Sequence, residues 1–289
     1  MAITPHPAPV PRGPVTAKLN FSHPLPAGIT AFNYVDTPPA GEPQRNLTPN
    51  PRAVNITDIR GREADFSLDH DAFQILQHIA PSAEESASNF LDDKSIATHY
   101  YPEVERLLLD AIPGSTRIHI FDHTIRRAAA SAPRKAVQNV HVDQTAYSAA
   151  KRVQRHMGDD AAALLQGRYR IVNVWRTLNK NPVESMPLAF ASSSTLEDAD
   201  VVPVEHRYPE GYVGQTAAIT YNPNQKWYYL SGMTGDERLL LECYDSEGAK
   251  EGSGVAGGRV PHSAFEDPRT RPDAEGRESI EVRALVFGP

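Results

Sequence analysis

The sequence has few of the features that mark secreted, membrane-spanning or nucleic-acid-binding proteins. It holds one cysteine, Cys243, in 289 residues, which excludes an intramolecular disulfide and favours a reducing compartment such as the cytoplasm. No segment approaches the run of about 20 apolar residues that a membrane-spanning helix needs. The 29 lysines and arginines are outnumbered by 36 acidic residues, so the net charge of −7 provides no broad basic field for nucleic acid.

The N-terminal segment is rich in proline and lacks the apolar stretch of a signal peptide. We expect residues 1–26 to form an extended arm and residues 27–289 to form a single domain, because this length suffices for one sizeable core. We expect a soluble, cytoplasmic protein whose partner is a small molecule rather than a membrane or a nucleic acid.

Hydrophobic periodicity predicts helices mainly in the first half of the chain and strands mainly in the second. The expected helices cover residues 69–79, 83–91, 101–112, 145–156 and 159–165. The expected strands cover residues 31–35, 53–59, 117–125, 169–176, 187–190, 217–221, 227–230, 239–244 and 279–287. This order is typical of an α+β protein with an antiparallel barrel or sandwich as its core.

One short segment, residues 139–143, carries a histidine and a carboxylate two positions apart. Residues two apart on a strand project to the same face, so His141 and Asp143 offer two adjacent metal ligands. His262, far downstream, is the candidate for a third. Two imidazoles and one carboxylate are the facial triad of non-haem Fe(II) oxygenases, although the tripeptide alone is commoner as a plain surface pair.

A rival metal set is His119, Asp122 and His123, whose spacing suits a helix. The alternation of apolar residues in this segment favours a strand instead, which separates the two histidines. A structural or pocket-lining role is therefore better supported. His99 and His206 have polar neighbours without evident partners, and we expect both to be exposed.

The last predicted strand has one apolar and one polar face. The polar face consists of Arg277, Ser279, Glu281 and Arg283. Such a face meets either water or the interior of a barrel. In the second case Arg277 is placed to pair with a cosubstrate carboxylate and Ser279 to add a hydrogen bond, with Arg283 as the substitute for Arg277.

The chain resembles the Fe(II)/2-oxoglutarate-dependent oxygenases, and within them the fungal gibberellin desaturase-like and AsaB-type hydroxylases and desaturases, relatives of a cephem-methoxylase component. The resemblance extends over most of residues 28–287 and is carried by residues 54–61, 141–144, 173–176, 227–230, 261–267 and 277–283. It implies a double-stranded β-helix (jelly-roll, cupin-like) core with flanking helices. It further implies that His141, Asp143 and His262 hold iron and that Arg277 and Ser279 anchor 2-oxoglutarate.

The activity implied by the resemblance is hydroxylation or desaturation of a small secondary metabolite by O2, with decarboxylation of 2-oxoglutarate to succinate and carbon dioxide. Asp143 argues against halogenation, because related halogenases lack this carboxylate. The resemblance also suggests that the strand with Asn173, Trp175 and Arg176 lines the substrate pocket, although Arg176 faces the other way and a surface salt bridge suits it better. Tyr147 either borders the site or is an ordinary aromatic residue at a helix start.

Two other functions fit the same ligands. One is a cupin-like isomerase or hydrolase that uses a divalent metal as a Lewis acid. The other is a β-helix binding module without turnover. Neither the substrate, the choice among hydroxylation, desaturation and cyclisation, nor the oligomeric state follows from the residues. The oxygenase is the leading hypothesis, because the triad and the Arg277–Ser279 pair occur together.

Overall fold

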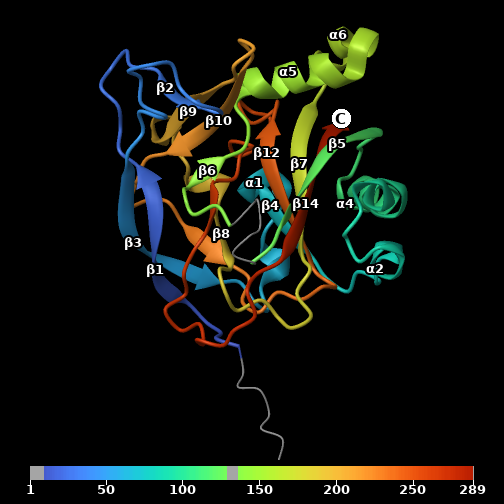
Figure 1. The fold of residues 1–289 in the computed structure, drawn as a ribbon. Helices are drawn as coiled ribbons and strands as arrows, with labels where there is room; N and C mark the ends of the chain where they lie inside the picture. Colours follow the sequence, from blue (N-terminus) through green and yellow to red (C-terminus); the bar gives the residue numbers. More distant parts are fainter. Residues whose placement is uncertain (1–9, 129–135, 289) are drawn as a thin grey trace, which may run out of the picture.

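Two β-sheets that face each other make up the body of the protein, as the computed structural model of residues 10–128 and 136–288 shows (Figure 1). The larger sheet has the order β1 (Val15–Ser22), β3 (Pro49–Asp58), β11 (Trp227–Tyr229), β8 (Leu188–Ala191), β13 (His262–Ala264), β6 (His141–Val142), β10 (Val213–Ile219), β9 (Val201–Arg207) and β2 (Ala31–Tyr34). The smaller sheet has the order β4 (Phe73–Leu76), β12 (Arg238–Asp245), β7 (Tyr169–Thr177), β14 (Ser279–Phe287) and β5 (Arg117–Arg126). Most neighbouring strands are antiparallel, as the sequence predicts; β3 with β11 and β2 with β9 are parallel.

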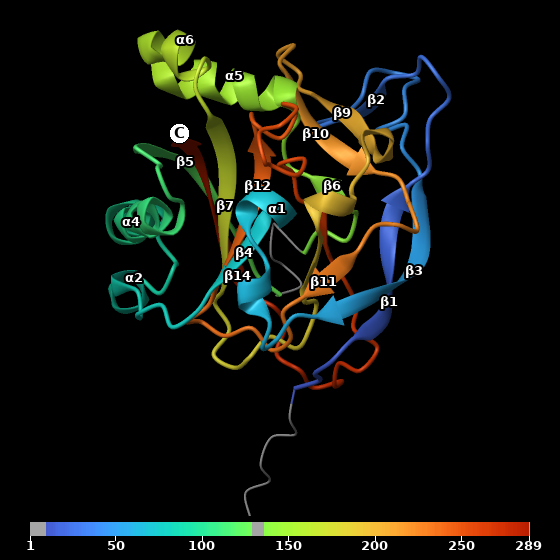
Figure 2. The same cartoon turned by 180° about the vertical axis from the view of Figure 1, so that it is seen from behind.

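The helices are α1 (Leu68–Asp71), α2 (Ala83–Ala87), α3 (Asp93–Ser95), α4 (Tyr101–Ala111), α5 (Ala146–Met157) and α6 (Ala161–Leu164), with single turns η1 (Glu63–Asp65), η2 (Ile96–Tyr100), η3 (Gly158–Asp160), η4 (Ser193–Thr195) and η5 (Asp198–Asp200). The helices α2, α4, α5 and α6 lie outside the two sheets, whereas the short α1 is drawn between them in both views (Figures 1 and 2). Val104 and Leu108 of α4 pack on the outer face of the smaller sheet. Within the described residues, no helix is both long and apolar enough to cross a membrane.

The last strand, β14, has the bounds that the sequence predicts, and it has one apolar and one largely polar face as expected. Ile280, Val282, Ala284 and Val286 belong to the apolar cluster beneath α4. The opposite face therefore points away from α4; its C-terminal residues Leu285 and Phe287 pack against α5 and α6, and the part before them faces the larger sheet. This face carries Ser279, Glu281 and Arg283, so the space between the sheets is polar on this side.

Two predicted helices are much shorter in the structure. The predicted helix over residues 69–79 is wrong beyond α1, because Ala72 adopts a left-handed φ of 61° and residues 73–76 continue as β4, paired with β12. The predicted helix over residues 83–91 ends with α2, since Asn89 and Phe90 both have positive φ. In β4 the burial alternates, with Phe73 and Ile75 inside. The apolar spacing of 73, 76 and 79 misleadingly imitates a helical stripe.

The strand β1 lies inside the segment that the sequence analysis describes as an extended arm. It pairs with β3 along its whole length, and Val15, Ala17, Leu19 and Phe21 are buried in the core. The prolines that flank it hide its alternation in the sequence. Only residues 1–9 of the predicted arm fall outside the described part of the chain.

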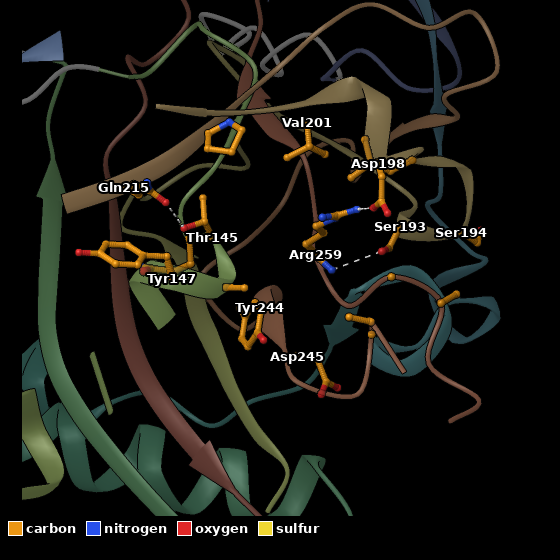
Figure 3. A pocket seen from close by; sticks show the side chains of 18 residues that line it. Thr145, Tyr147, Ser193, Ser194, Asp198, Val201, Gln215, Tyr244, Asp245 and Arg259 are labelled. Atoms are coloured by element: carbon orange, nitrogen blue, oxygen red, sulfur yellow. Dashed lines mark hydrogen bonds and ion pairs between the residues drawn. The ribbon is translucent and has the colours of Figure 1, made fainter. Parts of the chain in front are cut away.

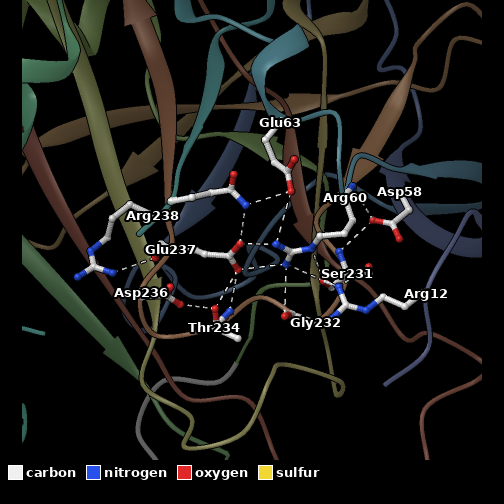
Figure 4. A network of polar contacts seen from close by, with 11 residues as sticks. Arg12, Asp58, Arg60, Glu63, Ser231, Gly232, Thr234, Asp236, Glu237 and Arg238 are labelled. Atoms are coloured by element: carbon white, nitrogen blue, oxygen red, sulfur yellow. Dashed lines mark hydrogen bonds and ion pairs between the residues drawn. The ribbon is translucent and has the colours of Figure 1, made fainter. Parts of the chain in front are cut away.

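A polar network fastens the start of β1 to the rest of the fold (Figure 4). The Arg12 side chain donates to the Ser231 carbonyl at 2.7 Å, and the backbone N–H of Gly13 donates to Asp58 Oδ2 at 2.8 Å. Beside them, Arg60 forms an ion pair with Glu237, which is 3 % exposed. Burial disfavours the charge of Glu237, but the hydrogen bonds from Arg60 and Thr234 outweigh it and lower its pKa.

We expect Glu237→Gln to lower the free energy of unfolding by about 2 kcal/mol, since it weakens hydrogen bonds between charged groups. Because folding lowers the pKa of Glu237 below its ordinary 4.5, the carboxylate stabilises the fold above that pH and loses its effect as the pH falls further. Chemical denaturation at several pH values gives the free energy of unfolding of the wild type and of Glu237→Gln. A difference between the two free energies that stays constant down to strongly acidic pH would contradict the role assigned to the Glu237 carboxylate.

Candidate metal centre

Two neighbouring strands of the larger sheet bring the three predicted metal ligands together. His141 in β6 and His262 in β13 are direct partners across the ladder, and their ring centroids lie 4.4 Å apart. Asp143 follows β6 and projects to the same side, with Oδ1 3.3 Å from His141 Nε2. One ligand atom from each of the three lies within 4.8 Å of the others, the sole such group in residues 10–128 and 136–288.

The backbone orients both imidazole rings. Nδ1 of His141 lies 2.8 Å from the carbonyl oxygen of Asn139, and Nδ1 of His262 lies 3.1 Å from that of Val260. A carbonyl only accepts hydrogen bonds, so each Nδ1 carries a proton and Nε2 is the ring nitrogen left to meet a metal. Metal-binding histidines are commonly held in this way.

The charges of the site favour an ionised Asp143 and a neutral His262, whereas Asp143 favours the protonated form of His141. Burial would raise the pKa of Asp143, but the hydrogen bond and charge of His141, with His262 and Arg283, hold that pKa well below its ordinary value. Burial and then the charge of His141 lower the pKa of His262 to about 4, so its ring is neutral at physiological pH. Burial opposes a charge on His141 too, yet Asp143 outweighs it and raises the pKa of that histidine.

Arg277 lies buried between the sheets without an acidic partner. It is 5 % exposed, its Nη1 donates to the Met186 carbonyl at 2.7 Å, and its Nε has no partner. Within the described residues no carboxylate comes within salt-bridge distance of this guanidinium, which lies 5.7 Å from the ring centroid of Trp175. Burial, followed by the charge of Arg126, lowers its pKa to about 10. An uncompensated buried cation is costly, so the site suits an anionic ligand.

The other predicted cosubstrate residues occupy different positions. Ser279 is 2 % exposed and begins β14 two residues after Arg277. Arg283 is already engaged, because it bonds to Asp122 at 2.8 Å and to Glu281 at 2.7 Å. The structure therefore gives no support to Arg283 as the substitute for Arg277.

A cavity of about 350 Å³ opens beside His141 and Asp143. Its lining includes Phe21, Phe32, Arg45, Val204, His206 and Thr216. His206 Nε2 lies 2.8 Å from Thr216 Oγ1, and its pKa is lowered by burial and then by the charge of His141. The prediction that His206 is exposed is wrong, because β9 was not identified. The alternation of Val202, Val204 and His206 is the signal that would have placed His206 on an inward face.

The three residues of β7 that are predicted for the substrate pocket lie on two faces of the strand. Asn173 and Trp175 share the inward face of β7, where Asn173 donates to Asp143 Oδ2 at 2.8 Å and Trp175 lies near Arg277. Arg176 lies on the opposite face, bonded to Glu85 at 2.7 Å and placed over Phe90, so it forms a salt bridge as predicted. The pair is not at the surface, however, because Arg176 is 4 % exposed.

Tyr147 does not border the three ligands in this arrangement. It is 50 % exposed on α5 and lines a separate cavity of about 690 Å³ together with Ser193, Asp198 and Arg259 (Figure 3). In that cavity Thr145 donates to Gln215 at 2.8 Å. The reading of Tyr147 as an ordinary aromatic at a helix start fits its place better.

The rival metal set is dispersed. His119 lies beside His156 with ring centroids 5.4 Å apart, whereas His123 is hydrogen-bonded to the Tyr101 hydroxyl at 2.8 Å. Asp122 pairs with Arg283. The strand reading of this segment is confirmed, and its histidines hold structural positions.

The known proteins that this chain is similar to are oxidoreductases. A family profile described as "Oxidoreductase/YMDC permease-like domain" matches residues 19–287. The hydroxylase/desaturase poxK of Penicillium oxalicum is 38 % identical over 302 residues, covering 96 % of this chain and 93 % of the relative. The Fe(II)/2-oxoglutarate-dependent dioxygenase nvfI of Aspergillus novofumigatus is 32 % identical over 259 residues, covering 88 % and 90 %.

One solved structure and a third sequence relative are similar to this chain as well. The iron and alpha-ketoglutarate-dependent endoperoxidase NvfI superimposes with a TM-score of 0.86 and 28 % sequence identity, over 96 % of this chain and 99 % of that one. The Aspergillus flavus hydroxylase/desaturase asaB is 39 % identical over 248 residues, which cover 82 % of this chain and 80 % of the relative.

Proposed function

The chain belongs to the family of Fe(II)/2-oxoglutarate-dependent hydroxylases and desaturases, and from this premise we propose that His141, Asp143 and His262 bind its iron. The protein is a dioxygenase that uses iron, 2-oxoglutarate and O2. The observation that carries the assignment of residues is the convergence of three ligand atoms within 4.8 Å. The relatives give no support to the isomerase, hydrolase or binding-module alternatives.

The residues present fit a divalent iron. Two neutral imidazole nitrogens and one carboxylate are the donor set of non-haem Fe(II) oxygenases, which leave further metal positions open. Both imidazoles present Nε2 because their Nδ1 atoms are hydrogen-bonded to the backbone. When iron and 2-oxoglutarate are bound, O2 would be the oxidant: its reduction, with two electrons from the decarboxylation of 2-oxoglutarate to succinate and carbon dioxide, would supply the oxidising power that removes hydrogen from a C–H bond.

In this proposal Arg277 pairs with the distal carboxylate of 2-oxoglutarate, and Ser279 donates a hydrogen bond to it. The support is the buried guanidinium, which has a free Nε and no acidic partner among the described residues. Its burial beside Trp175 keeps water away, which strengthens a bidentate pair with a carboxylate. In this proposal the inward polar face of β14 contacts the cosubstrate rather than the solvent.

The two facing sheets correspond, in our proposal, to a double-stranded β-helix within one oxygenase domain. The likeness to NvfI over nearly the whole chain supports it. So does the position of the ligands, on adjacent strands of one sheet and facing the other sheet. In this proposal the iron lies in the space between the sheets.

The substrate is a small molecule, and we assign it to the cavity of about 350 Å³ beside His141. Phe21, Phe32 and Val204 offer apolar contacts, while His206 and Thr216 form the polar wall. Their hydrogen bond holds the imidazole in one orientation near the iron ligands. The wall orients a polar group of the substrate, and the substrate's placement decides which hydrogen is removed.

Asp143→Ala and His262→Ala should each abolish stoichiometric metal binding, because two ligands no longer complete the site. Isothermal titration with Co(II) under nitrogen measures this without turnover. His99→Ala, a histidine remote from the site, is the control and should bind like the wild type. Full binding by either ligand variant would refute the triad.

Arg277→Ala should raise the dissociation constant of 2-oxoglutarate roughly 10- to 100-fold, the effect of losing hydrogen bonds to a charged group. Anaerobic titration of the Fe(II)-loaded protein, followed by its visible absorption, gives that constant. The matched control is Arg62→Ala, which removes an exposed arginine paired with Asp65. Equal constants for Arg277→Ala and the wild type would rule out the anchor.

His206→Ala should raise the KM of any substrate found by screening for O2-dependent succinate release, by roughly tenfold for one lost hydrogen bond. It should also raise the succinate formed per product, because a loosely held substrate uncouples the reaction. Tyr147→Ala tests the separate cavity and should change neither quantity. If Tyr147→Ala raised both quantities and His206→Ala raised neither, the substrate would have to be assigned to the cavity of Figure 3 instead.

A further inference from the structure

The two oxygens of the Asp143 carboxylate have different surroundings. Oδ1 faces the ligand cluster, 3.3 Å from His141 Nε2. Oδ2 faces the smaller sheet, where it accepts a hydrogen bond of 2.8 Å from Asn173 Nδ2 and lies 3.6 Å from Arg283 Nε. Only one oxygen of this carboxylate is therefore turned toward the other two ligands.

The two groups that face Oδ2 come from paired positions on adjacent strands. Arg283 of β14 and Asn173 of β7 are direct register partners, so their side chains emerge side by side from the same face. Asp143 belongs to the larger sheet, so this contact crosses from one sheet to the other.

Arg283 is immobilised by its own partners. Its Nη1 donates to Asp122 Oδ1 at 2.8 Å and to Thr124 Oγ1 at 3.0 Å, and its Nη2 donates to Glu281 Oε1 at 2.7 Å. These bonds occupy both terminal nitrogens and leave the Nε edge to meet Asp143. A guanidinium fixed in this way supplies directed positive charge at little further entropic cost.

Asn173 is placed there at a cost to the fold. It is fully buried, and its Oδ1 has no hydrogen-bond partner. A buried, unsatisfied amide oxygen destabilises a protein by about 1–3 kcal/mol, which an apolar residue would avoid. The reverse amide orientation would set Oδ1 against the Asp143 carboxylate, so Nδ2 must face it. The residue is thus explained by its contact with Asp143 rather than by stability.

We propose that Asn173 and Arg283 are positioning residues that hold Oδ2 of Asp143, so that this carboxylate binds the metal through Oδ1 alone. Binding through one oxygen preserves the open metal positions that 2-oxoglutarate and O2 require. The proposal rests on the iron site assigned above. It gives Arg283 and Asn173 a role different from cosubstrate or substrate binding.

The test compares Asn173→Ala, Asn173→Ser and Arg283→Lys with the wild type by titration with Co(II) under nitrogen. Arg283→Lys keeps the charge among Asp122, Glu281 and Asp143 but loses the planar donor array. Each variant should bind Co(II) 10- to 100-fold more weakly, the usual effect of losing a partner of a metal ligand. Thr177→Val, which removes a buried hydrogen bond elsewhere on β7, is the matched control and should bind Co(II) like the wild type.

A second measurement separates positioning from cosubstrate binding. At saturating Co(II), the dissociation constant of 2-oxoglutarate should change less than threefold in Asn173→Ala and Arg283→Lys. A higher constant for 2-oxoglutarate with unchanged Co(II) affinity would make Arg283 a cosubstrate anchor and overturn the proposal. Unchanged Co(II) affinity in all folded variants would overturn it as well. Failure of the wild type to bind Co(II) would instead refute the iron site itself.

Discussion

The contact of Asp143 with Asn173 and Arg283 is the interaction on which the candidate site depends most. It joins the end of β6 in one sheet to the middle of β7 and β14 in the other. A single carboxylate thereby takes part in the packing of the two sheets and in the metal site. Any shift of one sheet relative to the other changes the ligand geometry directly.

In β14 and the neighbouring part of β7, the smaller sheet presents apolar residues to α4, and β14 presents charged residues to the larger sheet. Its outer face supplies Val172, Val174, Ile280 and Val282 to the core beneath α4. Its inner face carries Arg277, Glu281 and Arg283, buried between the sheets. Burying these charges is costly, and Arg283 is compensated by Glu281, Asp122 and Asp143, whereas Arg277 has no acidic partner within the described residues. This imbalance is the physical reason to assign Arg277, and not Arg283, to an anionic cosubstrate.

The sequence allowed the adjacency of His141 and Asp143 to be predicted, because strand periodicity is a local signal. His262 followed from ligand chemistry and the family resemblance, since no local signal pairs β13 with β6. Strand periodicity also placed β14 and its polar face correctly. It failed for β4, where three apolar residues imitate a helical stripe and pairing with β12 decides the outcome. His206 and Arg283 could not be assigned, since their roles follow from partners on other strands, Thr216 in one case and Asp122 in the other.

The most direct test of the account is a crystal structure of the protein grown without oxygen in Fe(II) and 2-oxoglutarate, with anomalous data collected at the iron edge. The account predicts one iron peak bonded to His141 Nε2, His262 Nε2 and Oδ1 of Asp143, with the distal carboxylate of 2-oxoglutarate paired with Arg277. An iron peak elsewhere, or a 2-oxoglutarate carboxylate held by Arg283 in place of Arg277, would contradict it.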